Sequence, residues 1–432
     1  MSAKSKTKAD AVVPETIDKV AEETGAPSLL GRGIEETVWG HFKGYVRNVR
    51  NGDTGVLPAV GGLLVLMILF SSLHDKFFTD RNIANLLTQS AALITLAMAL
   101  VFVLLLGEID LSAGVTFGVA MGVFVKATQP GGLSWPVALL VALGIGLAVG
   151  TLIGFFVAKV GVPSFVVSLG LFLGLQGVIL LIIGAGGTYR LIPEEIKAIQ
   201  NSNMPPWAGW AMLVVVLALL AGVALWDRAR RAKQGAPNGP IGVVFIKLGA
   251  IAVFGGLVVW FLNQVRGGTD EKPLQGVPIV VPIVLALLIA GTFLLDRTKF
   301  GRNLYATGGN AEGARRAGVN VTVVKWTAFM VCSSLAVIAG VFYISKVGSA
   351  DAATGREIVL SGVAAAVVGG VSLFGGRGRL IYAVVGALVL SVIENGLLLL
   401  GLPAGVYLAT AGGVLILAAT VDALARGGGL RR

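Results

Sequence analysis

Long uncharged apolar runs are the feature that most limits what this chain can fold into. The run from Gly276 to Leu295 carries no charge, and neither does the run from Trp326 to Ser345. A helix crosses a bilayer with roughly 20 consecutive apolar residues. Because irregular backbone in lipid would leave its amide groups without hydrogen bonds, we expect such runs to be helical. The sequence therefore predicts an all-α, polytopic transmembrane helix bundle with about 10–12 spans.

The overall composition agrees with a chain that is mostly embedded in a membrane. Hydrophobic residues make up 55% of the sequence and charged residues 13%, whereas a soluble domain carries about 25% charged residues. The net charge of +11 does not indicate a nucleic-acid partner, because the cations lie in the short connections between apolar runs. That distribution is the signal that sets membrane topology. The single cysteine, Cys332, excludes an intrachain disulfide.

We expect twelve apolar segments along the chain, and they divide it into three parts. Residues 1–55 form a cytoplasmic tail, in which 38–50 is either an interfacial helix on the inner membrane face or a solvated segment. Residues 56–425 form the transmembrane domain, and 426–432 form a cytoplasmic C-terminal tail. The expected spans are Val56–Leu73, a second ending at Leu106, a third ending at Ala127, Leu133–Ala158, Pro163–Gly184, Trp207–Trp226, Ile241–Leu262, Gly276–Leu295, Trp326–Ser345, Ile358–Leu373, Leu380–Leu400 and Pro403–Val421.

The basic clusters between these runs predict that both termini are cytoplasmic, since cytoplasmic connections carry an excess of Lys and Arg. Counted from a cytoplasmic N-terminus, every such cluster falls inside when the number of spans is even. The short segments near Asp110 and Ile358 are either full spans, half-helices or re-entrant segments.

The polar connection 296–323 is the most informative of these loops. It contains several basic residues and only two acidic ones, which places it in the cytoplasm. Asn310 can cap a helix, and Gly318 stands where that helix would end with positive φ. A short cytosolic helix between two spans is a surface for docking another protein; the alternative is an ordinary basic loop that only sets topology. Ala314 is small enough to let a partner approach closely, and Glu312 lies in the first turn, where a negative charge is favourable.

Several motifs resemble those of sugar-importing ABC permeases. The connection contains Glu312-Gly313-Ala314-x-x-x-Gly318, which is similar to the Glu-Ala-Ala-x-x-x-Gly pattern of importer coupling loops. Further similar stretches are Phe77–Leu87, Gly107–Gly114 (Gly-x-Ile-Asp-Leu-Ser-x-Gly) and Ala364–Gly378, the last continuing to 393–397. The segment 228–276 resembles an addition found in xylose-type members and absent from the ten-span core of ribose-type permeases.

The resemblance implies the permease subunit of an importer for a monosaccharide such as D-xylose, in a bacterial plasma (inner) membrane. It implies a homodimer in the lipid bilayer, a pair of cytoplasmic ABC ATPase subunits and an extracytoplasmic sugar-binding protein. The residues that it assigns to ATPase coupling are Gly301, Arg302, Gly309, Asn310, Glu312, Ala314, Arg315 and Gly318.

No enzyme chemistry is indicated by the sequence. It has no Gly-x-x-x-x-Gly-Lys-Ser/Thr motif, so we expect the chain itself not to bind or hydrolyse ATP. Neither a metal-binding cluster nor a nucleophile–base pair stands out, and no cofactor is expected.

Ionisable and amide groups at membrane depth supply the candidates for a substrate pathway. Such groups are costly in lipid and are rarely incidental. The candidates are Asp110 with Ser112, and Glu394 with Asn395. In the alternative interpretation, Asp110 caps the following helix and Asn395 hydrogen-bonds a neighbouring helix. We favour the structural role for Asp110 and leave both open for Glu394 and Asn395.

Two other functions remain possible at this point. A proton-driven secondary transporter would use Glu394 or Asp110 as its proton site and would show inverted repeats, of which no clear example is visible. An ABC permease for another small polar solute, such as a branched amino acid or a nucleoside, would share the same loop. A membrane-anchored scaffold is a distant third.

Overall fold

The computed structural model of the protein describes residues 39–40, 55–235, 238–269, 273–356 and 358–427, without the side chains of 421–422 and 424–427. The interfacial helix expected at 38–50 lies almost entirely outside these residues. The chain divides into two compact units, which we describe separately: Met1–Asn51 with Val214–Gly255, and Gly52–Leu213 with Gly256–Arg432.

The apolar runs are helices, as predicted. Within the described residues, eight helices are long and apolar enough to cross a membrane, and four further apolar helices are shorter. The helices that follow the expected spans are α3 (Leu57–Leu73), α4 (Asp80–Leu104), α5 (Ser112–Ala127), α6 (Trp135–Gly154) continued by the π-helix η1 (Phe155–Val160), α7 (Ser164–Ile183), α9 (Pro206–Lys233), α10 (Ile241–Leu262), α11 (Val280–Arg297), α14 (Val321–Val347), α15 (Ile358–Val368), α16 (Leu380–Leu399) and α17 (Ala404–Gly427).

The described part of the smaller unit is formed mainly by the adjoining ends of α9 and α10. The Arg228 guanidinium donates to the Gly239 carbonyl at 2.5 Å, and the Asn238 side-chain amide donates to the Arg228 carbonyl at 3.2 Å. These bonds close the turn between two helices of 28 and 22 residues. Each helix alone is long enough to span the hydrocarbon core. The segment 228–276 therefore contains one helix of full span length, α10, together with the end of α9.

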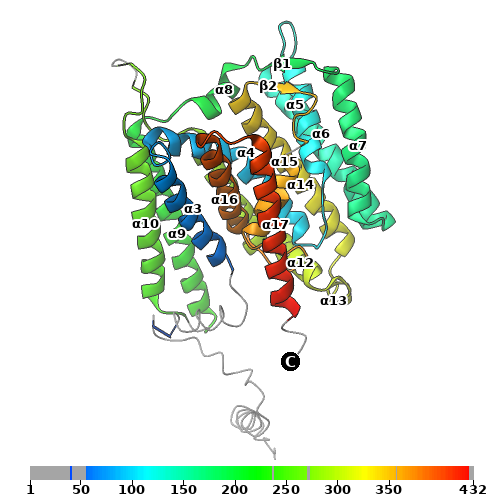
Figure 1. Cartoon of the computed structure of the whole chain (residues 1–432). Coiled ribbons are helices and arrows are strands. Elements are labelled where there is room, and N and C mark those ends of the chain that lie inside the picture. Colours follow the sequence, from blue (N-terminus) through cyan, green and yellow to red (C-terminus); the bar gives the residue numbers. More distant parts are fainter. Residues whose placement is uncertain (1–38, 41–54, 236–237, 270–272, 357, 428–432) are drawn as a thin grey trace, which may run out of the picture. The chain divides into compact units, whose positions relative to one another are not determined.

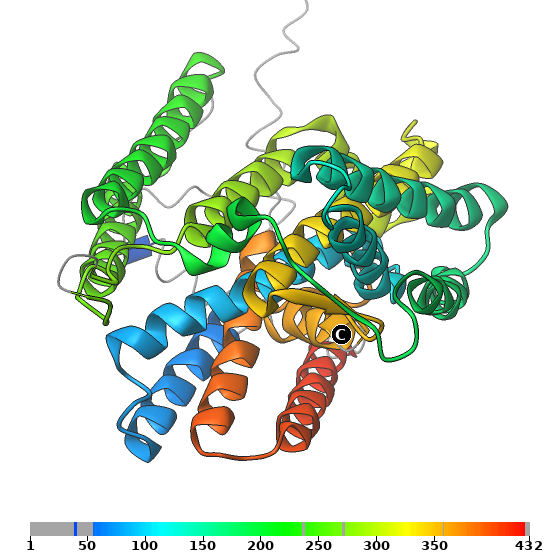
Figure 2. The same ribbon diagram turned by 90° about the horizontal axis from the view of Figure 1, so that it is seen from above.

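The larger unit has two distinct ends (Figure 1). A small antiparallel ladder pairs β1 (Thr188–Arg190) with β2 (Ser349–Asp351), and it lies at one end together with α8 (Glu194–Asn201). At the other end lie α12 (Lys299–Gly309) and α13 (Ala311–Arg316), on the same side as the C-terminal end of α17. Figure 2 views the bundle from the β1–β2 end.

Helices α4 and α14 form the centre of the larger unit. α4 is apolar on every side from Ala91 to Leu104 and is buried there, as expected for a helix that other helices surround. α14 packs against α4, α5 and α6.

A glycine stripe lets α6 approach α14 closely. Gly146, Gly150 and Gly154 recur every four residues, and a Cβ on Gly150 would lie 2.6 Å from the Phe329 carbonyl oxygen. Small residues at this spacing allow backbones to meet in a membrane, where packing rather than the hydrophobic effect drives helix association.

The segment before α15 is not helical, and α15 has only 11 residues. At 1.5 Å per residue such a helix is about 16 Å long, roughly half of a 30 Å hydrocarbon core. The preceding residues pack directly on α5: a Cβ on Gly118 would lie 2.1 Å from the Thr354 carbonyl oxygen, and one on Gly114 would lie 2.3 Å from the Gly355 carbonyl oxygen. Of the alternatives left open for this stretch, the structure has a half-length helix, and a turn at 352–356 lies before it.

The contact between α5 and the segment before α15 can be tested with Gly118→Ala. The added methyl group must displace the Thr354 backbone, and such overpacking costs about 1–3 kcal/mol. We expect a lower apparent unfolding midpoint for the detergent-purified protein. The matched control is Gly144→Ala on α6, because a Cβ there meets nothing within 4 Å and alanine favours a helix over glycine. Equal midpoints for the two variants would contradict the close approach.

Candidate functional site

The loop between α11 and α14 contains two capped helices rather than one. The Thr298 hydroxyl accepts from the Gly301 amide at 3.2 Å and starts α12, which the sequence analysis did not expect. The Asn310 side chain accepts from the Gly313 amide at 2.8 Å and starts α13, and Gly318 follows with φ +83°. The predictions of an Asn310 cap and of a positive φ at Gly318 are therefore confirmed. The sequence feature that could have predicted the start of α12 is Thr298, because threonine is a common helix N-cap residue.

α13 turns its charged residues outward and its alanine inward. Ala314 is 6% exposed, and its carbonyl accepts from the Val319 amide at 3.0 Å. Its small size therefore serves packing within its own chain, which corrects the expectation that it allows close approach of a partner. Glu312 is not a free charge: its two oxygens pair with Arg315 at 3.3 Å and with Arg316 at 3.1 Å. Because all three side chains are exposed, this pairing adds little stability and can be exchanged for contacts with a partner.

α12 lies against two irregular segments from distant parts of the chain. A Cβ on Gly308 would lie 1.7 Å from the Leu105 carbonyl oxygen and 2.9 Å from the Gly376 amide nitrogen. The Gly376 amide in turn donates to Leu105 O at 2.8 Å. We call the meeting point of Leu105–Gly107, Tyr305–Gly308 and Gly375–Gly378 the glycine junction. Three of the motifs singled out in the sequence therefore meet at one place.

The Tyr305 side chain crosses the glycine junction. Its hydroxyl donates to the Gly378 carbonyl at 2.8 Å. Burial, together with the nearby negative charge of Asp296, raises the pKa of Tyr305 to about 12, while Arg379 opposes the shift. The phenol therefore keeps its proton, and its role as donor, throughout the physiological pH range.

An ion pair connects the non-helical segment between α4 and α5 to the N-terminal part of α14. Lys325 Nζ lies 2.5 Å from Glu108 Oε1, and the two side chains are 23% and 15% exposed. Removing one partner of such a partly covered pair would leave a charge with poor solvation. Glu108 belongs to the same motif as Asp110, so this motif contacts α14 as well as the glycine junction.

Asp110 and Ser112 lie fully buried at the start of α5. Asp110 Oδ1 accepts from the Ser112 amide at 2.9 Å and from the Ser112 hydroxyl at 2.6 Å. Asp110 Oδ2 has no hydrogen-bond partner among the described residues. This geometry is that of the capping alternative, and neither side chain reaches an open surface in this conformation.

Glu394 and Asn395, adjacent in sequence, have different surroundings. Asn395 is buried and exchanges two hydrogen bonds with Asn82 of α4, at 2.8 and 3.0 Å between the amide nitrogen and oxygen atoms. Such a reciprocal pair is typical of helix–helix contacts in membranes. Glu394 is only half-buried and lies beside Gln89.

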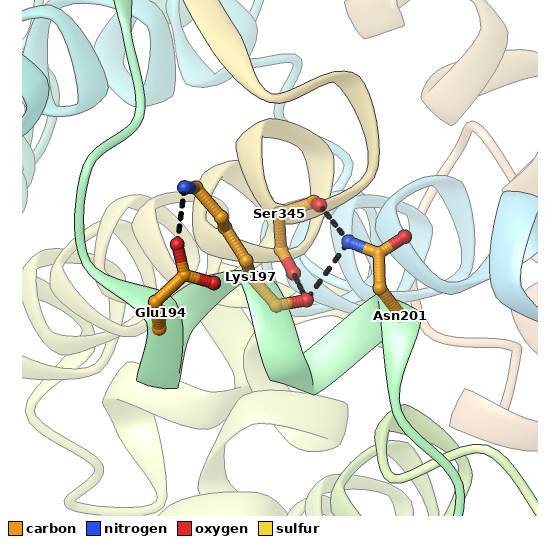
Figure 3. Close-up of polar contacts among 4 residues, drawn as sticks. All are labelled: Glu194, Lys197, Asn201 and Ser345. Atoms are coloured by element: carbon orange, nitrogen blue, oxygen red, sulfur yellow. Dashed lines mark hydrogen bonds and ion pairs between the residues drawn. The ribbon is translucent and has the colours of Figure 1, made fainter. Parts of the chain in front are cut away.

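The opposite end of the bundle is covered by α8 (Figure 3). The Asn201 amide donates to the Ser345 carbonyl at 3.0 Å, and the Ser345 hydroxyl lies 3.3 Å from the Lys197 carbonyl. The Ser345 hydroxyl also donates to the Ile196 carbonyl at 2.6 Å. Lys197 pairs with Glu194 at 2.7 Å. α8 is thus anchored on the end of α14, in a stretch where the sequence analysis placed no span. Within the described ranges, no group of three or more His, Cys, Asp or Glu side chains could hold a metal ion.

A family model described as "Branched-chain amino acid transport system / permease component" matches residues 82–419. This range is more than half of the chain and contains every motif discussed above except the first residues of Phe77–Leu87. The chain belongs to this permease family. Members are membrane-embedded transport components rather than enzymes, so the predictions of a multi-pass inner-membrane permease and of a non-enzyme are confirmed.

Curated relatives match the permease over most of their length. The xylose transport system permease protein XylH of Escherichia coli K12 is 34% identical over 372 residues, which are 85% of this chain and 91% of that protein. The ribose import permease protein RbsC of the same organism is 29% identical, over 83% of this chain and 91% of that protein. The autoinducer 2 import system permease protein LsrC of Photorhabdus luminescens is 28% identical, over 81% and 83%. No solved structure matches the chain significantly.

A double-mutant cycle on Asn82 and Asn395 separates the two roles considered for Asn395 in the permease. If the amide pair is structural, Asn82→Ala and Asn395→Ala each lower the apparent unfolding midpoint. The double variant then loses less stability than the two single variants lose together, and the coupling free energy is about 0.6–1.7 kcal/mol. If Asn395 contacts substrate, its replacement lowers uptake without a matching loss from Asn82→Ala. Additive effects on stability would contradict the structural role.

Proposed function

We propose that this permease is the membrane-spanning subunit of an ABC importer for a monosaccharide, and that the monosaccharide is a pentose such as D-xylose. The observation that carries the proposal is the match to XylH over 85% of this chain and 91% of the relative. The loop formed by α12 and α13 supports it, because it exposes a charged face and is tied to the bundle through the glycine junction. No covalent chemistry is assigned to this chain.

The coupling step is a mechanical one. A pair of cytoplasmic ATPase subunits would contact the exposed Glu312, Arg315 and Arg316 of α13, and closure of the ATPases would displace the loop. Because Gly308 and Tyr305 contact backbone at the glycine junction, a displaced α12 would push on the end of α4 and on the turn before α16. The contact at Gly308 has no side chain that could yield and absorb the movement.

The remaining parts of the transporter follow from the same proposal. Two copies of the permease would form a homodimer with the substrate path at or near their interface, and an extracytoplasmic sugar-binding protein would deliver the sugar. That partner would supply most of the sugar specificity. The loop 296–323 and both termini would face the cytoplasm. A permease that is one component of a transport system depends on other components, so we set aside the proton-driven single-chain transporter.

Two cysteine variants test the orientation, both made in a Cys332→Ala background because Cys332 is buried in the core. Ala317→Cys at the end of α13 should resist an impermeant maleimide in intact cells and react after permeabilisation. Glu195→Cys on α8 should react in intact cells. The reverse pattern would mean that the bundle has the opposite orientation.

Charge reversal on α13 tests the coupling role. We expect Arg315→Glu combined with Arg316→Glu to reduce ATP-dependent D-xylose uptake at least tenfold in liposomes that contain the permease with its ATPase and binding protein. It should also weaken co-purification of the ATPase, because α13 then presents only negative charge to its partner. Arg231→Glu combined with Lys233→Glu, at the exposed end of α9, applies the same charge change elsewhere and should be tolerated. Normal uptake by the double variant would rule out docking on this face.

The solute is tested in the same liposomes. D-xylose and D-ribose should be taken up only with ATP, ATPase and binding protein present, and L-leucine should not be taken up. Uptake of L-leucine instead would favour the branched-chain amino acid function that the family description names. Sugar uptake by the permease alone, driven by a proton gradient, would overturn the ABC assignment.

A further inference from the structure

Four polar side chains from four helices meet around Glu394. Gln89 of α4 is in hydrogen-bonding position to the Glu394 carboxylate, and the Tyr407 side chain of α17 lies near enough to interact with its charge. The Tyr407 hydroxyl donates to the Ser361 hydroxyl of α15 at 3.3 Å. We call Gln89, Ser361, Glu394 and Tyr407 the Glu394 cluster.

The cluster lies well inside the bundle, toward the β1–β2 end. α16 ends at Leu399, so Glu394 is about 8 Å from the end of its helix at 1.5 Å per residue. The next two residues of α16 are used for packing: Asn395 binds Asn82, and a Cβ on Gly396 would lie 2.4 Å from the Phe70 ring. Glu394 therefore belongs to a different face of α16 from the one that contacts α3.

All four side chains are half-buried, in contrast to the fully buried Asp110 and Ser112. None of the ion pairs found within the described ranges involves Glu394. An accessible carboxylate at this depth is very unfavourable against lipid tails, and such groups face a bundle interior or a water-filled cavity. The uncovered side of the Glu394 cluster is therefore expected to meet water and solute.

The chemistry of the cluster suits a neutral polyol. Each sugar hydroxyl is both a donor and an acceptor, and the cluster offers a carboxylate that accepts, an amide that does both and two hydroxyls that do both. Hydrogen bonds to a charged acceptor are the stronger ones. A fixed negative charge disfavours solutes with a net negative charge, because like charges repel at short range.

We propose that Gln89, Ser361, Glu394 and Tyr407 form a binding site for sugar hydroxyl groups on the translocation path, in the half of the bundle nearer to β1 and β2. This inference rests on the proposed sugar-import function. Glu394 accepts from sugar hydroxyls, Gln89 holds its carboxylate in position, and the Tyr407–Ser361 pair offers a second contact. The site selects against anionic solutes after the binding protein has released its cargo.

Thiol accessibility tests whether water and sugar reach the Glu394 cluster. In the Cys332→Ala background, Ser361→Cys should react with a charged methanethiosulfonate, which needs a water-exposed thiolate. Saturating D-xylose should slow that reaction severalfold in the complete transporter, and L-leucine should not. The control Leu417→Cys, at an apolar position of α17 that is 68% exposed, should not react. A Ser361→Cys that stays unlabelled would mean that lipid or a second copy of the chain covers the site, and would overturn the proposal.

Transport by variants tests the role of the side chains. We expect Glu394→Gln to lower D-xylose uptake about tenfold at subsaturating sugar, with a smaller loss at saturation. Tyr407→Phe should give a weaker loss of the same kind. Sugar-independent ATP hydrolysis and the unfolding midpoint should not change, which separates a substrate contact from a structural role. Thr420→Val is the control on α17, since its hydroxyl bonds only its own helix at Ile416 O.

The outcomes distinguish the site from the function. If the wild-type transporter takes up D-xylose and both variants behave like Thr420→Val, the proposed site is wrong and the importer function stands. If the wild-type transporter moves neither D-xylose nor D-ribose, the proposed function fails, and the sugar site fails with it. Should Glu394→Gln fail to fold, Tyr407→Phe and Ser361→Ala carry the same comparison.

Discussion

The irregular backbone between α4 and α5 must satisfy its hydrogen bonds inside the bundle, and much of the surrounding structure depends on that requirement. A lipid environment offers no water to replace a missing partner. The Gly376 amide donates to Leu105 O at 2.8 Å, the Ser164 hydroxyl accepts from the Ile109 amide at 3.2 Å, and the Ser168 hydroxyl donates to Ile109 O at 3.3 Å. The irregular segment between α4 and α5 is therefore hydrogen-bonded both to the start of α7 and to the turn before α16.

The same requirement links the loop formed by α12 and α13 to the bundle. Backbone can donate to backbone across chain segments only when no side chain stands between them, which is why glycine recurs at Gly107, Gly308, Gly375 and Gly376. α12 occupies the remaining side of this contact, and Tyr305 adds one bond across it. A surface loop that would otherwise be an ordinary connection is thus in direct contact with the ends of membrane-embedded segments, as a coupling element requires.

The polar groups of the bundle fall into two kinds. Asp110 with Ser112, Asn82 with Asn395 and Lys325 with Glu108 are paired within the chain. The first pair caps α5, and each of the other two holds two elements together. The Glu394 cluster differs because its side chains keep part of their surface uncovered. Exposure therefore separates groups that build the bundle from the groups that we propose to contact a solute, although their residue types are similar.

Much of this architecture could be predicted from the sequence, because lipid imposes a length and a composition on each span separately. The apolar runs, the Asn310 cap and the positive φ at Gly318 all depend on residues close together in the chain. Other features were decided only by the tertiary structure: the inward direction of Ala314, the docking of α8 on α14, the partnership of Asn395 with Asn82 and the meeting of distant glycine motifs around Leu105. The physical reason is that helix formation and capping are local, whereas close backbone approach and amide pairing depend on which helices become neighbours.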